Sequence, residues 1–308
     1  MPQLNRRVFG LALAGSAFAP AQDQEETGLT FRSDTREVLL HATVVDRKGA
    51  FVTDIPKEAF KIVEDGVEQK IKVFRREDVP VSMGLVVDNS GSMRRKRKKV
   101  EDSAVALVKA SNRQDEIFIV NFNDVAYRDA DLTSDVKKLE EGLSRIDAKG
   151  GTAMRDALTL SMDYVLAKGK RAKKVLLIVT DGDDTASSDT NTLEKLLAKA
   201  QRSEVLIFAI GILNEEDRRS AKRAQRALEL LTKQSGGIAH FPKDVDSIEE
   251  VALQIAKEIR NQYIIAYSPT KPDDGAYRKL NVTVKGSGLT VRTRTGYYAK
   301  GDEKRSSL

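Results

Sequence analysis

Short apolar runs of strand length alternate with amphipathic segments of helix length from Pro80 to about residue 261. The apolar runs lie at 81–86, 116–122, 174–180 and 205–210. The segments whose apolar residues recur at helical spacing lie at 100–108, 136–146, 152–164, 193–202, 215–233 and 248–259. Strands joined through a helix usually run parallel in one sheet. The alternation therefore predicts an α/β fold, a parallel sheet with helices on both faces.

Strand-like segments also lie on both sides of this region. Val38–Asp46 comes first, and the segments 60–64 and 69–74 flank an Asp65-Gly66 pair, which is a strong hairpin signal. Further strand segments follow the last helix, at 263–267, 278–284, 289–294 and 296–298. Each flank is too small to build a core alone, so we expect the two to pair into one small β-sandwich-like module.

The first 21 residues differ in kind from the rest of the chain. Arg6 and Arg7 precede a short apolar run that ends in small residues and Ala19-Pro20-Ala21, which is typical of a secretory signal peptide. The arginine pair also fits a twin-arginine leader. We therefore expect a secreted or periplasmic protein, exported by the Sec or the twin-arginine route. The alternative is a disordered N-terminus of a cytoplasmic protein.

These patterns divide the chain into consecutive parts. We expect a signal peptide at 1–21, a linker at 22–35, an N-terminal β segment at 36–79, an α/β domain at 80–261, a C-terminal β segment at 262–299 and a tail at 300–308. A chain of 308 residues is long enough to bury a large core and exceeds the usual size of a single domain.

Composition excludes several classes of site. The sequence has no cysteine, which excludes disulfides, thiolate zinc sites and cysteine nucleophiles. His41 and His240 are its only histidines, too few for a His-rich metal site and little material for a Ser-His-Asp triad. The formal net charge of +6 is modest for this length and does not indicate nucleic-acid binding.

Polar side chains follow the first apolar run of the α/β region. Asp88 ends that run, and Ser90 and Ser92 follow at alternate positions, which points the three side chains towards a common side. Three hard oxygen donors suit Mg²⁺, Mn²⁺ or Ca²⁺. The same residue types also cap backbone N–H groups at turns between strands and helices. On this stretch alone, capping and metal binding both remain open.

A second set of oxygen donors is expected at the same edge of the sheet. Asp181 ends the apolar run 174–180, and Thr152 follows a Gly-Gly turn at the head of a helix. Ligands of parallel sheets bind outside the carboxyl ends of the strands, where the strand order reverses. Thr152 and Asp181 are also ordinary cap and turn residues when taken singly. Together with Asp88, Ser90 and Ser92 they predict one site of five oxygen donors for Mg²⁺, with Mn²⁺ or Ca²⁺ as alternatives.

Three short motifs together resemble the metal-ion-dependent adhesion site (MIDAS) of von Willebrand factor type A (VWFA) domains: Asp88-x-Ser90-x-Ser92, Gly151-Thr152 and Thr180-Asp181-Gly182. All five ligand positions match. Over residues 36 to 299 the chain resembles the bacterial exported branch of VWFA-related proteins, on the segments TDIPKEAFKIVEDG and RKLNVTVKGSGLTVRTRTGYY.

The resemblance implies a Rossmann-like domain in which the two serines and the threonine bind Mg²⁺ directly and the two aspartates act through water. Neutral hydroxyls leave the charge of the metal partly uncompensated, so that an acidic residue of a partner can complete its coordination. The function that follows is metal-dependent protein binding of the adhesion type, without catalysis, to a protein partner whose identity the sequence does not give.

The run Arg94–Lys99 consists of six cations at the expected start of a helix, where the helix dipole disfavours positive charge. One hypothesis is that these cations flank the metal and attract an acidic partner or an anionic lipid surface. The other is a solvated helix face. A nucleic-acid patch does not fit an exported protein.

Two other functions use the same oxygen cluster. A metal-dependent hydrolase or phosphatase is one, although no general base is evident near the motifs. A structural metal that staples the strand ends together is the other. Asp183 and Asp184 are candidates for a second metal site, and we expect them to be turn and cap residues instead.

Overall fold

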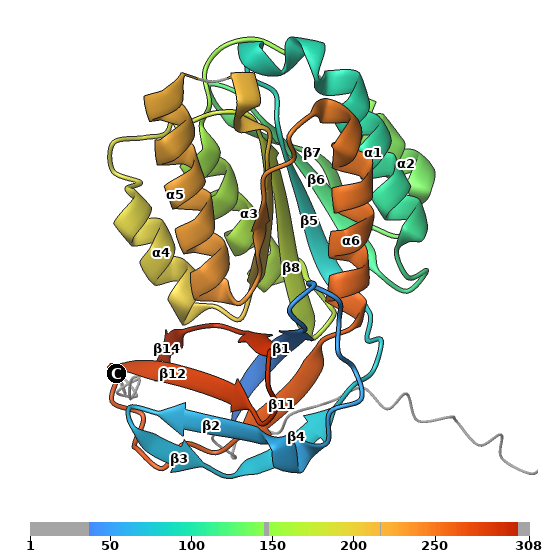
Figure 1. Cartoon of the computed structure of the whole chain (residues 1–308). Coiled ribbons are helices and arrows are strands. Elements are labelled where there is room, and N and C mark those ends of the chain that lie inside the picture. Colours follow the sequence, from blue (N-terminus) through green and yellow to red (C-terminus); the bar gives the residue numbers. More distant parts are fainter. Residues whose placement is uncertain (1–36, 145–147, 216, 301–308) are drawn as a thin grey trace, which may run out of the picture. The chain divides into compact units, whose positions relative to one another are not determined.

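A computed structural model describes residues 37–144, 148–215 and 217–300. The expected signal peptide, linker and tail beyond Lys300 lie outside the described residues. The described residues belong to one compact unit. They form a six-stranded α/β part followed and preceded by strands of a β module (Figure 1). None of the described helices is both long and apolar enough to span a bilayer.

The sheet of the α/β part has the strand order β10-β9-β8-β5-β6-β7. Its strands are β5 (Val81–Asp88), β6 (Glu116–Phe122), β7 (Ala126–Thr133), β8 (Lys173–Thr180), β9 (Leu206–Gly211) and β10 (Ala239–His240). All neighbours are parallel except β6 and β7. The predicted fold class, a Rossmann-like parallel sheet with helices on both faces, is confirmed.

Helices cover both faces of this sheet. They are α1 (Arg97–Ala110), α2 (Val136–Ser144), α3 (Met154–Lys168), α4 (Leu193–Arg202), α5 (Arg218–Ser235) and α6 (Ile248–Arg260). Figure 1 shows α1, α2 and α6 on one face and α3, α4 and α5 on the other. The short 3-10 turns are η1 (Lys57–Ala59), η2 (Gly91–Arg95), η3 (Leu213–Glu215) and η4 (Val245–Ser247). Because both faces are covered, the central strands are largely apolar, with polar residues mainly near their ends.

The central strand β5 shows why its sequence fits this position. Met83, Leu85 and Val87 pack with α1 and α6, whereas Val86 packs with α3 on the opposite face. Gly84 leaves room for a neighbouring ring, because a Cβ at this position would lie 2.3 Å from Phe118 Cζ. Apolar side chains on both faces bury the strand completely and hold its carboxyl end in place.

Strand β7 is absent from the sequence-based assignment. It forms an antiparallel edge of the sheet, connected to β6 by the turn at Asn123–Val125. Its segment contains Arg128, Asp129 and Asp131, and Ala130 is its only fully buried residue. Most side chains of this edge strand are exposed or only half-buried, so its sequence lacks the apolar signal of a buried strand.

The β module consists of two four-stranded sheets that enclose a separate apolar core. One sheet has the order β13-β1-β11-β4 and the other β14-β12-β2-β3. The strands are β1 (Val38–Val45), β2 (Phe60–Glu64), β3 (Val67–Gln69), β4 (Ile71–Arg75), β11 (Tyr263–Tyr267), β12 (Tyr277–Val284), β13 (Thr290–Arg292) and β14 (Gly296–Tyr298). Each sheet combines strands from both flanks of the chain, which confirms the predicted β-sandwich-like module.

The predicted hairpin around Asp65-Gly66 is correct at the turn and wrong beyond it. Both residues have positive φ, as a two-residue hairpin turn requires. Only Val67–Gln69 pairs with β2, however, and Ile71–Arg75 crosses to the other sheet, where it pairs with β11. A sandwich needs strands in both sheets, and the break at Lys70 supplies one to each.

Charged side chains are buried where α6 ends beside the β module. Arg292 Nη2 of β13 lies 2.9 Å from Glu258 Oε1, whose side chain is 1% exposed. Lys173 donates to the carbonyl of Ile259, and burial lowers the pKa of Lys173 to about 7, with the nearby Arg260 acting in the same direction. Burial raises the pKa of Glu258, and the charges of Arg292 and Lys173 oppose that rise. The two parts of the protein therefore share a network of charges that depend on one another.

We expect Arg292→Met to lower the free energy of unfolding by about 2–3 kcal/mol at pH 8, because it leaves the carboxylate of Glu258 buried with less compensation. The folded pKa of Glu258 lies above its unfolded pKa. The stability that this group contributes therefore falls as the pH rises from the unfolded pKa to the folded pKa. The loss should therefore be smaller at pH 5 than at pH 8, because protonation of Glu258 on lowering the pH removes the uncompensated charge. Urea unfolding at both pH values measures it.

Lys61→Met is the matched control. Lys61 Nζ lies 2.8 Å from Glu68 Oε2 in the same β module, but both side chains are more than half exposed. Lys61→Met should lower the free energy of unfolding by less than about 1 kcal/mol at both pH values. An Arg292→Met loss that is equal at pH 5 and pH 8 would contradict the role assigned to Glu258.

Candidate metal centre

Strands β5 and β8 end side by side at the carboxyl edge of the sheet. They are parallel neighbours, with Val87 opposite Val179. The chain leaves β5 for β6 on one side and returns to β8 on the other, so the strand order reverses beside β5. Asp88 is the last residue of β5, and Asp181 directly follows β8. Both aspartates therefore lie at the position where open α/β sheets bind ligands.

The carboxylate of Asp88 is buried and bound on both oxygens. Its Oδ1 accepts a hydrogen bond from the backbone N–H of Ser90 at 2.8 Å, and its Oδ2 accepts one from the hydroxyl of Thr180 at 2.5 Å. Burial raises the pKa of Asp88 to about 6, and the charge of Asp181 adds to the rise, while these hydrogen bonds oppose it. The site therefore brings two carboxylates close together in a buried setting, which favours a cation beside them.

A chain of hydroxyls connects the two motifs. Ser90 Oγ lies 3.0 Å from Ser92 Oγ, and Ser92 Oγ donates to Asp181 Oδ1 at 2.8 Å. The side chain of Asp181 is 0% exposed, and its Oδ2 accepts from Lys96 Nζ at 2.7 Å. Ser92 itself is exposed. The cluster thus extends from the buried carboxylates to the surface of the protein.

Thr152 lies beside this cluster in a neighbouring loop. The N–H of Gly91 donates to the carbonyl of Gly150 at 3.1 Å, and Asp124 Oδ1 accepts from the N–H of Gly151 at 2.7 Å. Gly150 has φ +74°, and a Cβ there would lie 2.1 Å from Asp124 Oδ2, so glycine is required. In the described structure, hydrogen bonds join Asp88, Ser90, Ser92 and Asp181, whereas the Thr152 loop approaches through its backbone.

The neighbouring aspartates have other roles. Asp184 Oδ2 accepts from the backbone N–H of Arg155 at 2.8 Å in the first turn of α3, and its Oδ1 lies 3.2 Å from the guanidinium of the same arginine. Asp183 Oδ2 pairs with Arg223 of α5 at 2.5 Å. Asp184 thus caps the first turn of α3, as expected, whereas Asp183 pairs with an arginine of a neighbouring helix.

Lys96, Thr180 and Asp124 also belong to this site, although the sequence names none of them as a ligand. Lys96 is one of the six cations at 94–99, yet it is 2% exposed. A signal was available, because Lys96 stands four residues before Val100 and eight before Ala104, both of which face the core. That spacing places Lys96 on the buried face of the helix start.

The residues present fit a hard divalent cation. In the ranges 37–144, 148–215 and 217–300, no group of three or more His, Asp or Glu side chains could hold a metal ion. A metal at this edge would therefore depend on hydroxyl oxygens in addition to the two carboxylates, which is the donor chemistry that Mg²⁺ and Mn²⁺ accept. The ammonium of Lys96 on Asp181 already shows that a cation is accommodated there.

Neither histidine belongs to the cluster. His41 lies in β1 of the β module and His240 in the edge strand β10. Burial lowers the pKa of both imidazoles, with help from nearby cationic side chains. No hydrogen bond joins either of them to the aspartates and hydroxyls of the site in the described part of the chain.

Residues 83–183 match the family model of the von Willebrand factor type A domain. The structure is also similar to a von Willebrand factor type A protein from Catenulispora acidiphila, with a TM-score of 0.52 at 14% identity over 89% of this chain and 77% of that one. The match assigns residues 83–183 to a von Willebrand factor type A (VWFA) domain. The matched residues include β5, β6 and β8, so the VWFA domain carries the candidate site.

Two curated relatives match part of this chain. Integrin alpha-11 of Mus musculus is 31% identical over 112 residues, which are 34% of this chain and 9% of the integrin. The human integrin alpha-11 is 35% identical over 88 residues, or 27% of this chain and 7% of the integrin. The chain thus spans less than a tenth of the length of these relatives.

A second solved structure is proximal thread matrix protein 1 from the mussel byssus, described with a zinc-occupied MIDAS motif. It has a TM-score of 0.51 at 16% identity and covers 65% of this chain and 50% of its own. At such identities the likeness shows a shared fold. What these proteins bind is considered below as support for a proposal.

We expect Thr180→Val to lower the free energy of unfolding by about 1.5–3 kcal/mol in EDTA, because a buried carboxylate loses the hydroxyl bound to it. Urea unfolding measures the loss. Thr283→Val is the control, since Thr283 is an exposed residue of β12; its effect should stay within about 0.5 kcal/mol. Equal effects of the two variants would contradict the account of Asp88.

Proposed function

We propose that this protein is an exported, metal-dependent binding module that holds an acidic residue of a protein partner at the carboxyl edge of its VWFA domain. Asp88, Ser90, Ser92, Thr152 and Asp181 would hold the metal. Mg²⁺ is the proposed ion, with Mn²⁺ and Ca²⁺ as alternatives of the same donor preference. We propose adhesion or protein binding as the role and no catalytic reaction.

The observation that supports this proposal most is the exposed residue Ser92 at the end of a buried polar chain. Asp88 and Asp181 are 2% and 0% exposed, whereas Ser92 is open to solvent. A partner would therefore approach the cluster from the side of Ser92 and not through its buried carboxylates. A divalent cation held there would supply a Lewis-acid position for an incoming carboxylate. The protein's own residues then orient the ion and keep its charge only partly compensated.

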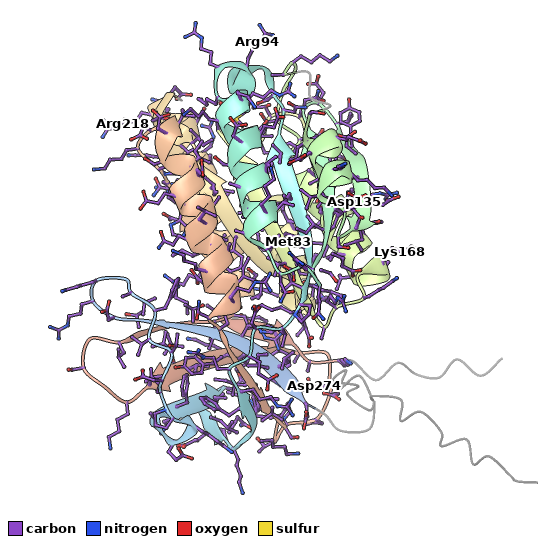
Figure 2. The ribbon with its side chains drawn as sticks, turned by 90° about the vertical axis from the view of Figure 1, so that its right-hand side faces the viewer. Met83, Arg94, Asp135, Lys168, Arg218 and Asp274 are labelled. Atoms are coloured by element: carbon purple, nitrogen blue, oxygen red, sulfur yellow. The ribbon has the colours of Figure 1, made fainter. Side chains whose placement is uncertain are left out.

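The charges around the site favour an acidic partner. Arg94 and Arg95 of η2 and Arg218, Arg219 and Lys222 of α5 are exposed. Figure 2 shows Arg94 and Arg218 at the same end of the α/β part, with Asp274 in the β module at the other end. A rim of cations raises the local concentration of an anionic partner and its association rate. This supports a protein with an acidic surface over other partners.

The two remaining functions have less support. A hydrolase would need a group placed to activate water or a substrate, and neither histidine contacts the cluster. A purely structural metal does not account for an exposed hydroxyl or for the cations around it. Binding in an extracytoplasmic compartment also agrees with the leader-like first 21 residues.

Metal uptake is the first test. We expect the full chain to bind one Mg²⁺ or Mn²⁺ in isothermal titration calorimetry, and we expect Ser90→Ala combined with Ser92→Ala to weaken binding at least about tenfold. Asp183→Asn is the matched control, because Asp183 is two residues from Asp181 and pairs with Arg223. It should bind as the wild type does. Unchanged uptake by the double variant would rule out the proposed ligands.

Partner capture is the second test. Envelope extract passed over the immobilised protein should yield an acidic protein when Mg²⁺ is present and lose it in EDTA. The Ser90→Ala, Ser92→Ala variant should fail to retain that protein in Mg²⁺. Retention that is indifferent to EDTA would contradict metal-dependent binding, and a lower melting temperature in EDTA without any partner would support the structural role instead.

A further inference from the structure

Lys96 differs from every other cation in the run Arg94–Lys99. Arg94, Arg95, Lys98 and Lys99 are exposed, and Lys98 and Lys99 pair at the surface with Asp102 and Asp246. The side chain of Lys96 is 3% exposed and its ammonium lies 2.7 Å from Asp181 Oδ2. A lysine is rarely so buried without a specific counter-charge. The counter-charge here is a proposed metal ligand.

The backbone fixes Lys96 in this position. Lys96 precedes α1, its N–H donates to the carbonyl of Met93, and its own carbonyl accepts from Val100. Met93 and Val100 are both buried in the core of the domain. The start of the helix is therefore anchored on both sides of Lys96, and its side chain is directed inward to the end of β8.

The ammonium completes the polar cluster of the site. One oxygen of Asp181 accepts from Ser92 and the other accepts from Lys96, while both oxygens of Asp88 are bound by Ser90 and Thr180. The described arrangement thus satisfies both carboxylates by means of the protein's own donors. Two buried negative charges are balanced by one buried positive charge.

We infer that Lys96 is a built-in cation of the site, which holds Asp181 in place without metal and competes with a divalent ion for that carboxylate. The inference rests on the proposed metal site. A positive charge beside the ion weakens metal binding. With the ion bound, the same charge leaves a larger positive excess, which the carboxylate of a partner neutralises. Metal and acidic partner should then bind cooperatively, each weakly without the other.

The test compares three variants of the full chain with the wild type by isothermal titration with Mg²⁺ and with Mn²⁺. Lys96→Met keeps an unbranched side chain of similar length and removes its charge, so we expect metal to bind about tenfold tighter or more. Lys96→Gln, which keeps a hydrogen-bond donor, should show the same direction. Lys98→Met removes a charge from the same run at an exposed position and should change the affinity less than about twofold.

Thermal melting supplies a readout that does not depend on the size of the binding heat. In EDTA, Lys96→Met should melt well below the wild type, because Asp181 loses its buried counter-charge. Mg²⁺ should raise its melting temperature more than that of the wild type or of Lys98→Met. Metal affinity in both Lys96 variants equal to or weaker than that of the wild type would overturn the inference.

The outcomes separate this inference from the proposed function. If the wild type binds metal and the Lys96 variants bind it no more tightly, the inference on Lys96 fails and the metal site stands. If only the Lys96 variants bind, the inference holds and the wild type is not a metal-dependent module in the absence of a partner. If no form binds Mg²⁺ or Mn²⁺, both fail.

Discussion

Two carboxylates lie buried side by side at the ends of β5 and β8. The surrounding loops must supply the groups that stabilise their charge. A buried charge is tolerated only with hydrogen bonds and opposite charge around it. Asp88 obtains a backbone N–H and a hydroxyl, and Asp181 obtains a hydroxyl and the ammonium of Lys96. The course of η2 and the start of α1 follow from this requirement, because those segments supply the donors.

The opposite edge of the sheet meets the same requirement by other means. Lys173 is the first residue of β8. The amino end of this strand therefore lies among Glu258 and Arg260 of α6 and Arg292 of the β module, and its carboxyl end lies at the candidate site. One strand thus connects a network that joins the two parts of the protein with the site that faces a partner. The edge at the amino end of β8 lies against the β module, and the edge at its carboxyl end is accessible to solvent at Ser92.

Much of this arrangement could be predicted because the carboxyl ends of parallel strands lie at the same edge of a sheet. The apolar runs at β5 and β8 predict buried strands, and the two aspartates that end them must then meet at one edge. The burial of Lys96 could also have been found, from its spacing to Val100 and Ala104. The edge strand β7 and the crossing of Ile71–Arg75 to the second sheet were missed, because solvent-facing edges and sandwich corners leave little periodic signal.

The sequence by itself determined the fold class and the position of the aspartates at the ends of two strands, since both depend on local pattern and on strand order. Only the tertiary structure decided which donors meet. Asp181 and Ser92 are far apart in the chain and lie 2.8 Å apart at their oxygens, and Lys96 turns from a run of surface cations into the core. Such contacts depend on how helix α1 packs on the sheet. The spacing of apolar residues indicates which face of the helix is buried, but only the packing of the helix brings its side chains to their partners.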